Sequence, residues 1–154
     1  MRATLCTLAL LLAVSASAQP HPQQDGLFLE MGGHGGMFTV SYEREVGPVI
    51  PRLGLGLSPM GVHVPALVSH RFGDGRGRLS AGAGAVFVIA APEQEFSSPV
   101  WPAATLGYRF DLPNAPLALR AEFTPFWMPG DDLAAWIGLG VGVSFDRRHV
   151  NRTR

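Results

Sequence analysis

Seven charged residues of both signs fall on one side of a repeated two-residue pattern. They are Glu30, Glu43, Arg52, Arg71, Arg109, Arg120 and Glu122. Carboxylates held close together can act as general acid and general base when the pKa of one of them is raised. Guanidinium groups interleaved among them oppose such a rise and favour ion pairing. The residue types therefore predict a charge network rather than a catalytic pair, if the fold brings them together.

Other reactive residues do not form a recognisable catalytic or metal-binding pattern. Ser69 and His70 are adjacent, and neighbouring residues of a strand point to opposite faces, so this hydroxyl and imidazole would not meet. The five histidines occur singly, and the one cysteine, Cys6, excludes a thiolate metal site. We therefore expect no catalytic residues, no metal and no cofactor.

The composition removes several classes of protein. The chain has 154 residues, a net charge of zero, 47% hydrophobic and 16% charged residues, and its twelve basic residues are all arginine. This is too little charge for a coiled coil and too much apolar content for a disordered chain. No basic excess exists to bind nucleic acid. The length fits a single domain.

Apolar residues alternate with polar or small ones in eight segments, and this pattern is typical of β-strands. The segments are 27–32, 38–43, 52–58, 62–69, 79–89, 100–110, 117–127 and 133–145. Stretches rich in Gly, Pro, Asn and Asp separate them. Several segments are as long as a tilted membrane-spanning strand. The sequence predicts an all-β, eight-stranded, antiparallel up-and-down barrel.

The last segment shows most clearly which face is apolar. Its odd-numbered positions from Leu133 to Phe145 are all apolar, while its even-numbered positions are mostly glycine, alanine or serine. The seven charged residues fall on faces opposite such apolar rows. A soluble barrel has the reverse arrangement. Apolar side chains outside and charged ones inside indicate a transmembrane barrel, with a narrow lumen filled by paired glutamate and arginine.

Aromatic residues recur where the even-numbered segments end, each with an arginine close by. They are Tyr42, Phe72, Tyr108, Phe110 and Phe145. In an up-and-down barrel these ends share one rim. We expect the rings to form an aromatic girdle at the membrane interface.

Residues 1–18 have the pattern of a secretory signal peptide. Arg2 precedes an apolar run from Leu5 to Val14, and small residues lead to an Ala-x-Ala ending at Ala18. The apolar run is too short to span a bilayer as a helix. We expect cleavage after Ala18 and export of residues 19–154.

The signal peptide, the eight alternating segments and the final run Val141–Phe145 resemble the small OmpA/OmpX-type outer-membrane β-barrels. The resemblance covers 19–145 and is one of pattern. It implies a bacterial outer-membrane location, contact with outer-membrane lipid and a periplasmic N-terminus. It also implies that Phe145 is read by the barrel-assembly machinery. Residues 146–154 depart from the pattern, forming a polar, basic C-terminal tail.

Two further groups of residues are candidate sites. His63, Trp101, Phe126 and Trp136 are expected near the outer mouth. Three arrangements are open for them. The first two are a vestibule for an apolar ligand and packing that caps the lumen. If the strand register differs by one residue, they instead belong to an outer aromatic girdle. Pro102 and Pro125 lie symmetrically about the 111–116 turn. Neither has a backbone N–H group to donate to a neighbouring strand. We expect them nearly opposite each other, marking a lateral opening or a frayed rim.

The sequence favours a monomeric, non-enzymatic bacterial outer-membrane barrel with a charged, plugged lumen. Its role would be structural in the envelope, or contact with a lipid or small molecule. Two alternatives stay open. One is a soluble periplasmic or secreted β-barrel that binds a ligand inside, and the other is a lipid A-modifying outer-membrane enzyme.

Overall fold

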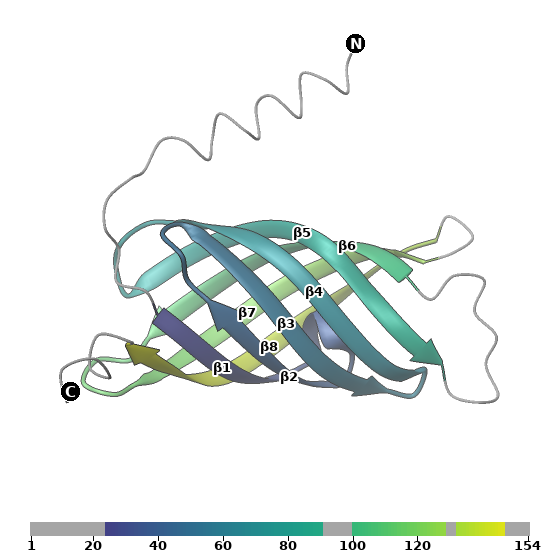
Figure 1. The fold of residues 1–154 in the computed structure, drawn as a ribbon, viewed down its shortest axis with the longest axis horizontal. Coiled ribbons are helices and arrows are strands. Elements are labelled where there is room, and N and C mark those ends of the chain that lie inside the picture. Colours follow the sequence, from purple (N-terminus) through teal and green to yellow (C-terminus); the bar gives the residue numbers. More distant parts are fainter. Residues whose placement is uncertain (1–23, 91–99, 129–131, 147–154) are drawn as a thin grey trace, which may run out of the picture.

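The computed structural model describes residues 24–90, 100–128 and 132–146. Eight strands form a closed antiparallel barrel in which each strand pairs with the next and β1 pairs with β8 (Figure 1). The strands are β1 (Gln24–Met31), β2 (Phe38–Arg44), β3 (Val49–Ser58), β4 (Gly61–Phe72), β5 (Gly77–Ala90), β6 (Val100–Asp111), β7 (Leu117–Met128) and β8 (Asp132–Asp146). The predicted eight-stranded up-and-down barrel is confirmed. The predicted signal peptide and tail residues 147–154 lie outside the described residues.

The strand register keeps the two faces of the sheet separate around the whole barrel. Leu27 on β1 lies opposite Tyr42 on β2 and opposite Val143 on β8. Because side chains alternate along a strand, this register places apolar residues beside apolar ones on the outer face. It also places the charged residues beside one another in the lumen.

Some strands begin earlier than the alternation indicated, because tight turns join them. β3 starts at Val49, where reciprocal backbone hydrogen bonds with Val46 close a two-residue turn. Gly47 has a φ of +62° in this turn, a conformation that glycine adopts without a steric penalty. β5 likewise begins at Gly77, so Arg78 belongs to a strand.

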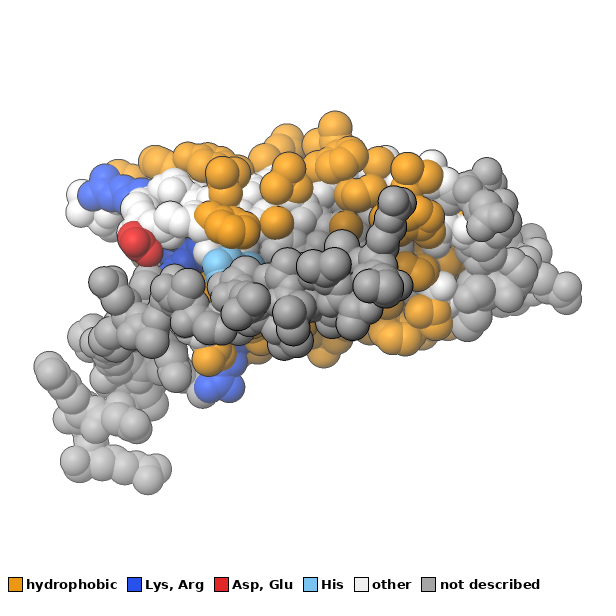
Figure 2. Space-filling view, turned by 90° about the horizontal axis from the view of Figure 1, so that it is seen from above, with side chains coloured by type: hydrophobic (Ala, Val, Ile, Leu, Met, Phe, Trp, Pro, Cys, Tyr) orange, Lys and Arg blue, Asp and Glu red, His pale blue; other side chains and the backbone are white. Residues whose placement is uncertain are grey.

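The outer wall of the barrel is apolar along its length. Ile137 and Leu139, near the middle of β8, expose 74% and 64% of their surface. Figure 2 shows hydrophobic side chains along the visible wall and charged ones gathered toward one end. Two charged residues continue the outer rows of β1 and β2, Asp25, which is buried, and Arg44, and they lie opposite each other near strand ends. No helix in the described parts of the chain is long and apolar enough to cross a membrane.

A short 3₁₀ helix, η1 (Gly33–Gly35), lies inside the barrel between β1 and β2 in the chain. All three of its residues are buried, and it packs against β2, β3, β4, β7 and β8. Glycines on the barrel wall make room for it. A Cβ atom on Gly56 would lie 1.9 Å from the Gly35 carbonyl oxygen, and one on Gly138 would lie 2.8 Å from Gly33. The wall and the inserted helix therefore fit only without side chains at these positions.

We expect Gly56→Ala to lower the free energy of unfolding by about 1–3 kcal/mol, the usual cost of overpacking. The added methyl group must displace η1, because the atom it meets is backbone. Urea titration followed by the gel shift of the folded band measures the change. Gly75→Ala is the control, since its nearest neighbour would be 3.9 Å away. Equal stability of the two variants would contradict the proposed fit of η1 against β3.

Candidate functional site: the charged lumen

The structure brings together all seven charged residues that the sequence singled out. Each points into the lumen, and none exposes more than 8% of its surface. They come from six strands, so the closed barrel, rather than any single hairpin, assembles the network. The arrangement has two tiers along the barrel axis.

The upper tier centres on Glu122 and Arg120 of β7. Glu122 accepts hydrogen bonds from Arg52 Nη1 at 2.5 Å and from His34 Nδ1 of η1 at 2.9 Å. Arg120 donates to Glu30 at 2.8 Å and to Glu43 at 2.7 Å. Each buried charge thus has at least one partner of opposite sign, as burial in a narrow lumen requires.

The Arg120 guanidinium also lies over the ring of Phe28, with its central carbon 3.6 Å from the ring centroid. Phe28 is fully buried, and the guanidinium of Arg109 approaches the same ring at 5.2 Å. An aromatic face attracts a cation and shields it from water. Phe28 therefore stabilises the upper tier and fills the lumen at the same time.

The lower tier centres on Glu45, which follows β2. Its two oxygens accept hydrogen bonds from Arg71 at 2.5 Å, Arg78 at 3.2 Å and Arg109 at 3.0 Å. Arg109 also donates to Glu43 at 2.5 Å and so links the two tiers. Asp111 accepts from both Arg78 and Arg109.

Four members of this network were missed in the sequence. They are His34, Glu45, Arg78 and Asp111. Arg78 continues the inward row of β5 one position before Leu79, so extending the alternation by one residue would have found it. His34 follows no strand period, because it reaches the lumen on an inserted helix. With these additions, the lumen network of the described residues holds five carboxylates and five guanidiniums, together with His34.

Comparison with known proteins bears on the fold. No protein-family model matches the chain, and no curated protein matches it by sequence. The chain is similar to a solved structure, the crystal structure of the N-terminal β-barrel domain of Pseudomonas aeruginosa OprF. The TM-score is 0.58 at 15% sequence identity, and the match covers 80% of this chain and 96% of that one. This chain has the OmpA-type barrel fold.

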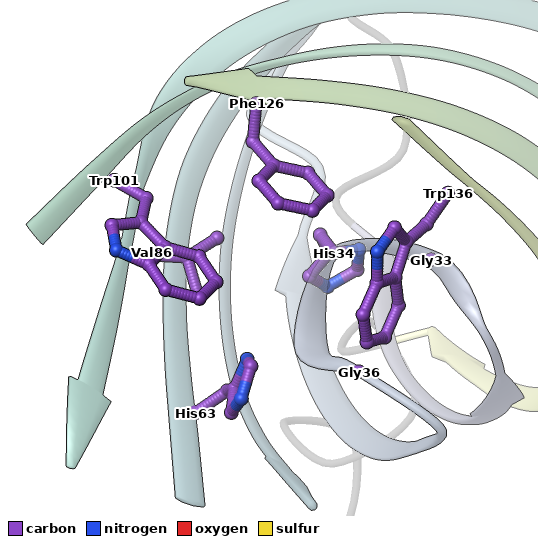
Figure 3. Close-up of a pocket in the computed structure, with 8 residues that line it drawn as sticks. All are labelled: Gly33, His34, Gly36, His63, Val86, Trp101, Phe126 and Trp136. Atoms are coloured by element: carbon purple, nitrogen blue, oxygen red, sulfur yellow. The ribbon is translucent and has the colours of Figure 1, made fainter. Parts of the chain in front are cut away.

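At one end of this OmpA-type barrel, the four predicted aromatic and histidine residues form a closed group (Figure 3). Trp101 stacks on Phe126 with ring centroids 5.6 Å apart, and Phe126 meets Trp136 edge-on at 5.9 Å. His63 contacts both tryptophans. The cavity that they line with η1 measures only about 10 Å³, the space of one water molecule. Among the described residues the rings therefore pack together at the top of the lumen.

The structure also pairs a serine with a histidine that the sequence analysis did not connect. The Ser58 hydroxyl lies 2.8 Å from His63 Nε2 and accepts a hydrogen bond from the Met60 backbone amide at 3.0 Å. A nucleophilic serine needs such a base, and the base usually has an orienting third group. No described carboxylate bonds to His63. The described contacts are those of a serine that stabilises the 58–61 turn.

Ser69 and His70, the adjacent pair noted in the sequence, are kept apart as expected from strand geometry. Ser69 is buried, and His70 packs on Phe72 with ring centroids 4.8 Å apart.

Pro102 and Pro125 do not lie opposite each other, contrary to expectation. Pro102 pairs with Ala85 on β5, and Pro125 pairs with Ala135 on β8. The β6–β7 register is shifted by two residues from the symmetric turn that the sequence implied. The pairing of β6 with β7 is interrupted between Ala103–Phe126 and Leu106–Phe123, next to Pro125. The lateral opening remains a prediction.

The five predicted girdle residues all lie on the outer face. Their exposed fractions range from 38% for Phe110 to 52% for Phe72. They lie at the strand ends nearest the start of β1 and the end of β8 (Figure 1). This is the position that the sequence predicted for them.

Proposed function

We propose that this protein is a non-enzymatic barrel of the bacterial outer membrane whose lumen is closed by its own side chains. It would act as a structural element of the envelope that contacts outer-membrane lipid. One observation carries the proposal. The outer wall is apolar, while ten charged side chains pair inside. A wall of this kind is stable in lipid and costly in water.

The soluble ligand-binding barrel is a weaker candidate because both of its requirements are poorly met. A soluble barrel needs a polar outer face, and here leucines such as Leu53, Leu55 and Leu57 expose more than half of their surface. A ligand-binding interior needs a cavity, and the central lumen is occupied by charged pairs with only about 10 Å³ of free space.

Closure of the lumen supports a structural role over transport. Arg52, Glu43, Glu122 and Arg120 cross the middle of the barrel from three strands. An ion would have to separate these pairs in order to pass, which exposes unpaired charges in a narrow space. The expected state of the lumen is therefore closed.

We expect the protein in the outer-membrane fraction, as a folded band that changes its migration on boiling. In planar bilayers we expect no sustained conductance. Recovery in the soluble periplasmic extract, without a heat-dependent shift, would refute the membrane assignment.

Lipid A mass spectra of cells making the protein or its Ser58→Ala variant should be identical, and a difference between them would refute the non-enzymatic role.

A further inference from the structure

We propose that the lumen end next to the β4–β5 turn binds a small oxyanion, carrying a phosphate or carboxylate group. This end opens into a cavity of about 400 Å³, within the size range of small-molecule sites. Three arginines line it, Arg71, Arg76 and Arg78, together with three carboxylates, Glu45, Asp74 and Asp111. It lies at the end of the barrel where β1 begins and β8 ends (Figure 1). The aromatic group is at the other end.

Two of the carboxylates of this cavity, Glu45 and Asp111, are already occupied by arginine. Both oxygens of Glu45 and both oxygens of Asp111 accept hydrogen bonds from guanidinium groups. Three arginines, Arg71, Arg78 and Arg109, thus face these two carboxylates. Arg109 is further engaged by Glu43 and Ser144. The lower tier therefore has one guanidinium more than it has carboxylates, and Glu43 of the upper tier offsets that charge through Arg109.

Hydrogen-bond donors are also in excess at this end. A guanidinium carries five N–H groups, and among the described residues the Arg71 guanidinium makes one hydrogen bond, to Glu45. Arg78 is only 8% exposed, and its buried Nε has no hydrogen-bond partner among the described residues. A buried donor without an acceptor is costly, so this site favours a ligand that accepts hydrogen bonds.

The geometry selects an anion with two or more oxygens. Arg71 and Arg78 donate to the same oxygen of Glu45, at 2.5 and 3.2 Å, so their guanidinium groups lie side by side. Adjacent planar forks match the oxygens of a phosphate or carboxylate group. Arg76, on the exposed turn at the rim, adds further N–H donors at the entrance, and Asp74 on the same turn offsets its charge.

Titration calorimetry on the folded, detergent-solubilised protein tests this site, with inorganic phosphate and succinate as separate ligands at constant ionic strength. We expect saturable binding of at least one of them. Stronger binding of phosphate assigns the site to phosphate groups, and stronger binding of succinate assigns it to carboxylates. Loss of one charge-assisted hydrogen bond in Arg71→Gln should weaken binding about tenfold. Glu45 keeps Arg78 and Arg109 in this variant, so the barrel should fold.

Arg44→Gln is the matched control, because Arg44 lies at the same end but on the outer face, beside Asp25. Its affinity should equal that of the unmodified protein. Arg76→Gln provides a second variant outside the ion-pair network, and it too should weaken binding. Absence of saturable binding of both anions, or equal weakening by the Arg71 and Arg44 substitutions, would overturn the inference. Such a result would leave the membrane location and closed lumen of the proposed function untouched.

Discussion

Replacing Glu122 by methionine is expected to lower the free energy of unfolding by about 3–5 kcal/mol. The substitution keeps the side-chain length but removes the carboxylate that accepts hydrogen bonds from Arg52 and His34. Arg52 is then left in the lumen with Glu43 at 3.5 Å as its remaining ion-pair partner. A buried charge that loses its partner costs far more than a lost neutral hydrogen bond. Urea titration of the folded band in lipid vesicles measures the change.

The double variant Arg52→Met with Glu122→Met separates charge from packing. It removes both members of the pair, so it should be more stable than the sum of the two single losses predicts. Ser41→Ala is the control that removes a buried hydrogen bond but no charge, because its hydroxyl donates to the Glu30 carboxylate at 3.1 Å, and it should cost about 1.5–3 kcal/mol. If the two single effects simply add, the charge network does not stabilise the barrel in the manner described.

Replacing Leu139 by arginine is expected to destabilise the barrel in lipid by about 2–4 kcal/mol, whereas Leu133→Arg should cost about 0–1 kcal/mol. Both leucines lie on the outer face of β8 and expose nearly the same fraction, 64% and 62%. They differ in depth, since Leu139 is at the middle of the strand and Leu133 near its end. The unfolding free energy of each variant in vesicles gives the comparison.

This pair of variants distinguishes a membrane environment from water. In water, two exposed leucines on one strand should tolerate arginine equally well, because surface substitutions usually change stability little. A depth-dependent penalty arises only where the outer wall contacts hydrocarbon. Equal effects of the two substitutions would argue against a transmembrane barrel, whatever the shape of the fold.

The alternation in the sequence was sufficient to predict the strands and their faces, because the period of two is imposed by strand geometry itself. It correctly placed Glu30, Arg52 and Arg120 in the lumen without knowledge of the register. It failed where a residue reaches the lumen by another route. His34 arrives on η1, and Glu45 follows the end of β2, so neither belongs to an alternating run.

The register between neighbouring strands was also beyond the sequence. The expected apposition of Pro102 and Pro125 assumed that β6 and β7 pair symmetrically about their turn, and a two-residue shift in register removes it. Register depends on how the whole barrel closes, since every strand must match two neighbours at once. The partner of a charge, such as Glu122 for Arg52, depends on closure in the same way.

Closure of β1 on β8 also determines when the lumen network forms during folding. Arg120 and Glu30 are 90 residues apart in the chain, and His34 and Glu122 are 88 apart. Contacts of such long range form late, after local hairpins, because loop closure is entropically costly. Until then we expect the sheet to be open and its charges to remain hydrated. Interactions absent from the folding transition state act mainly on the unfolding rate. The ion pairs of the lumen should therefore have little effect on the folding rate of the barrel. Their main effect should be to slow its unfolding.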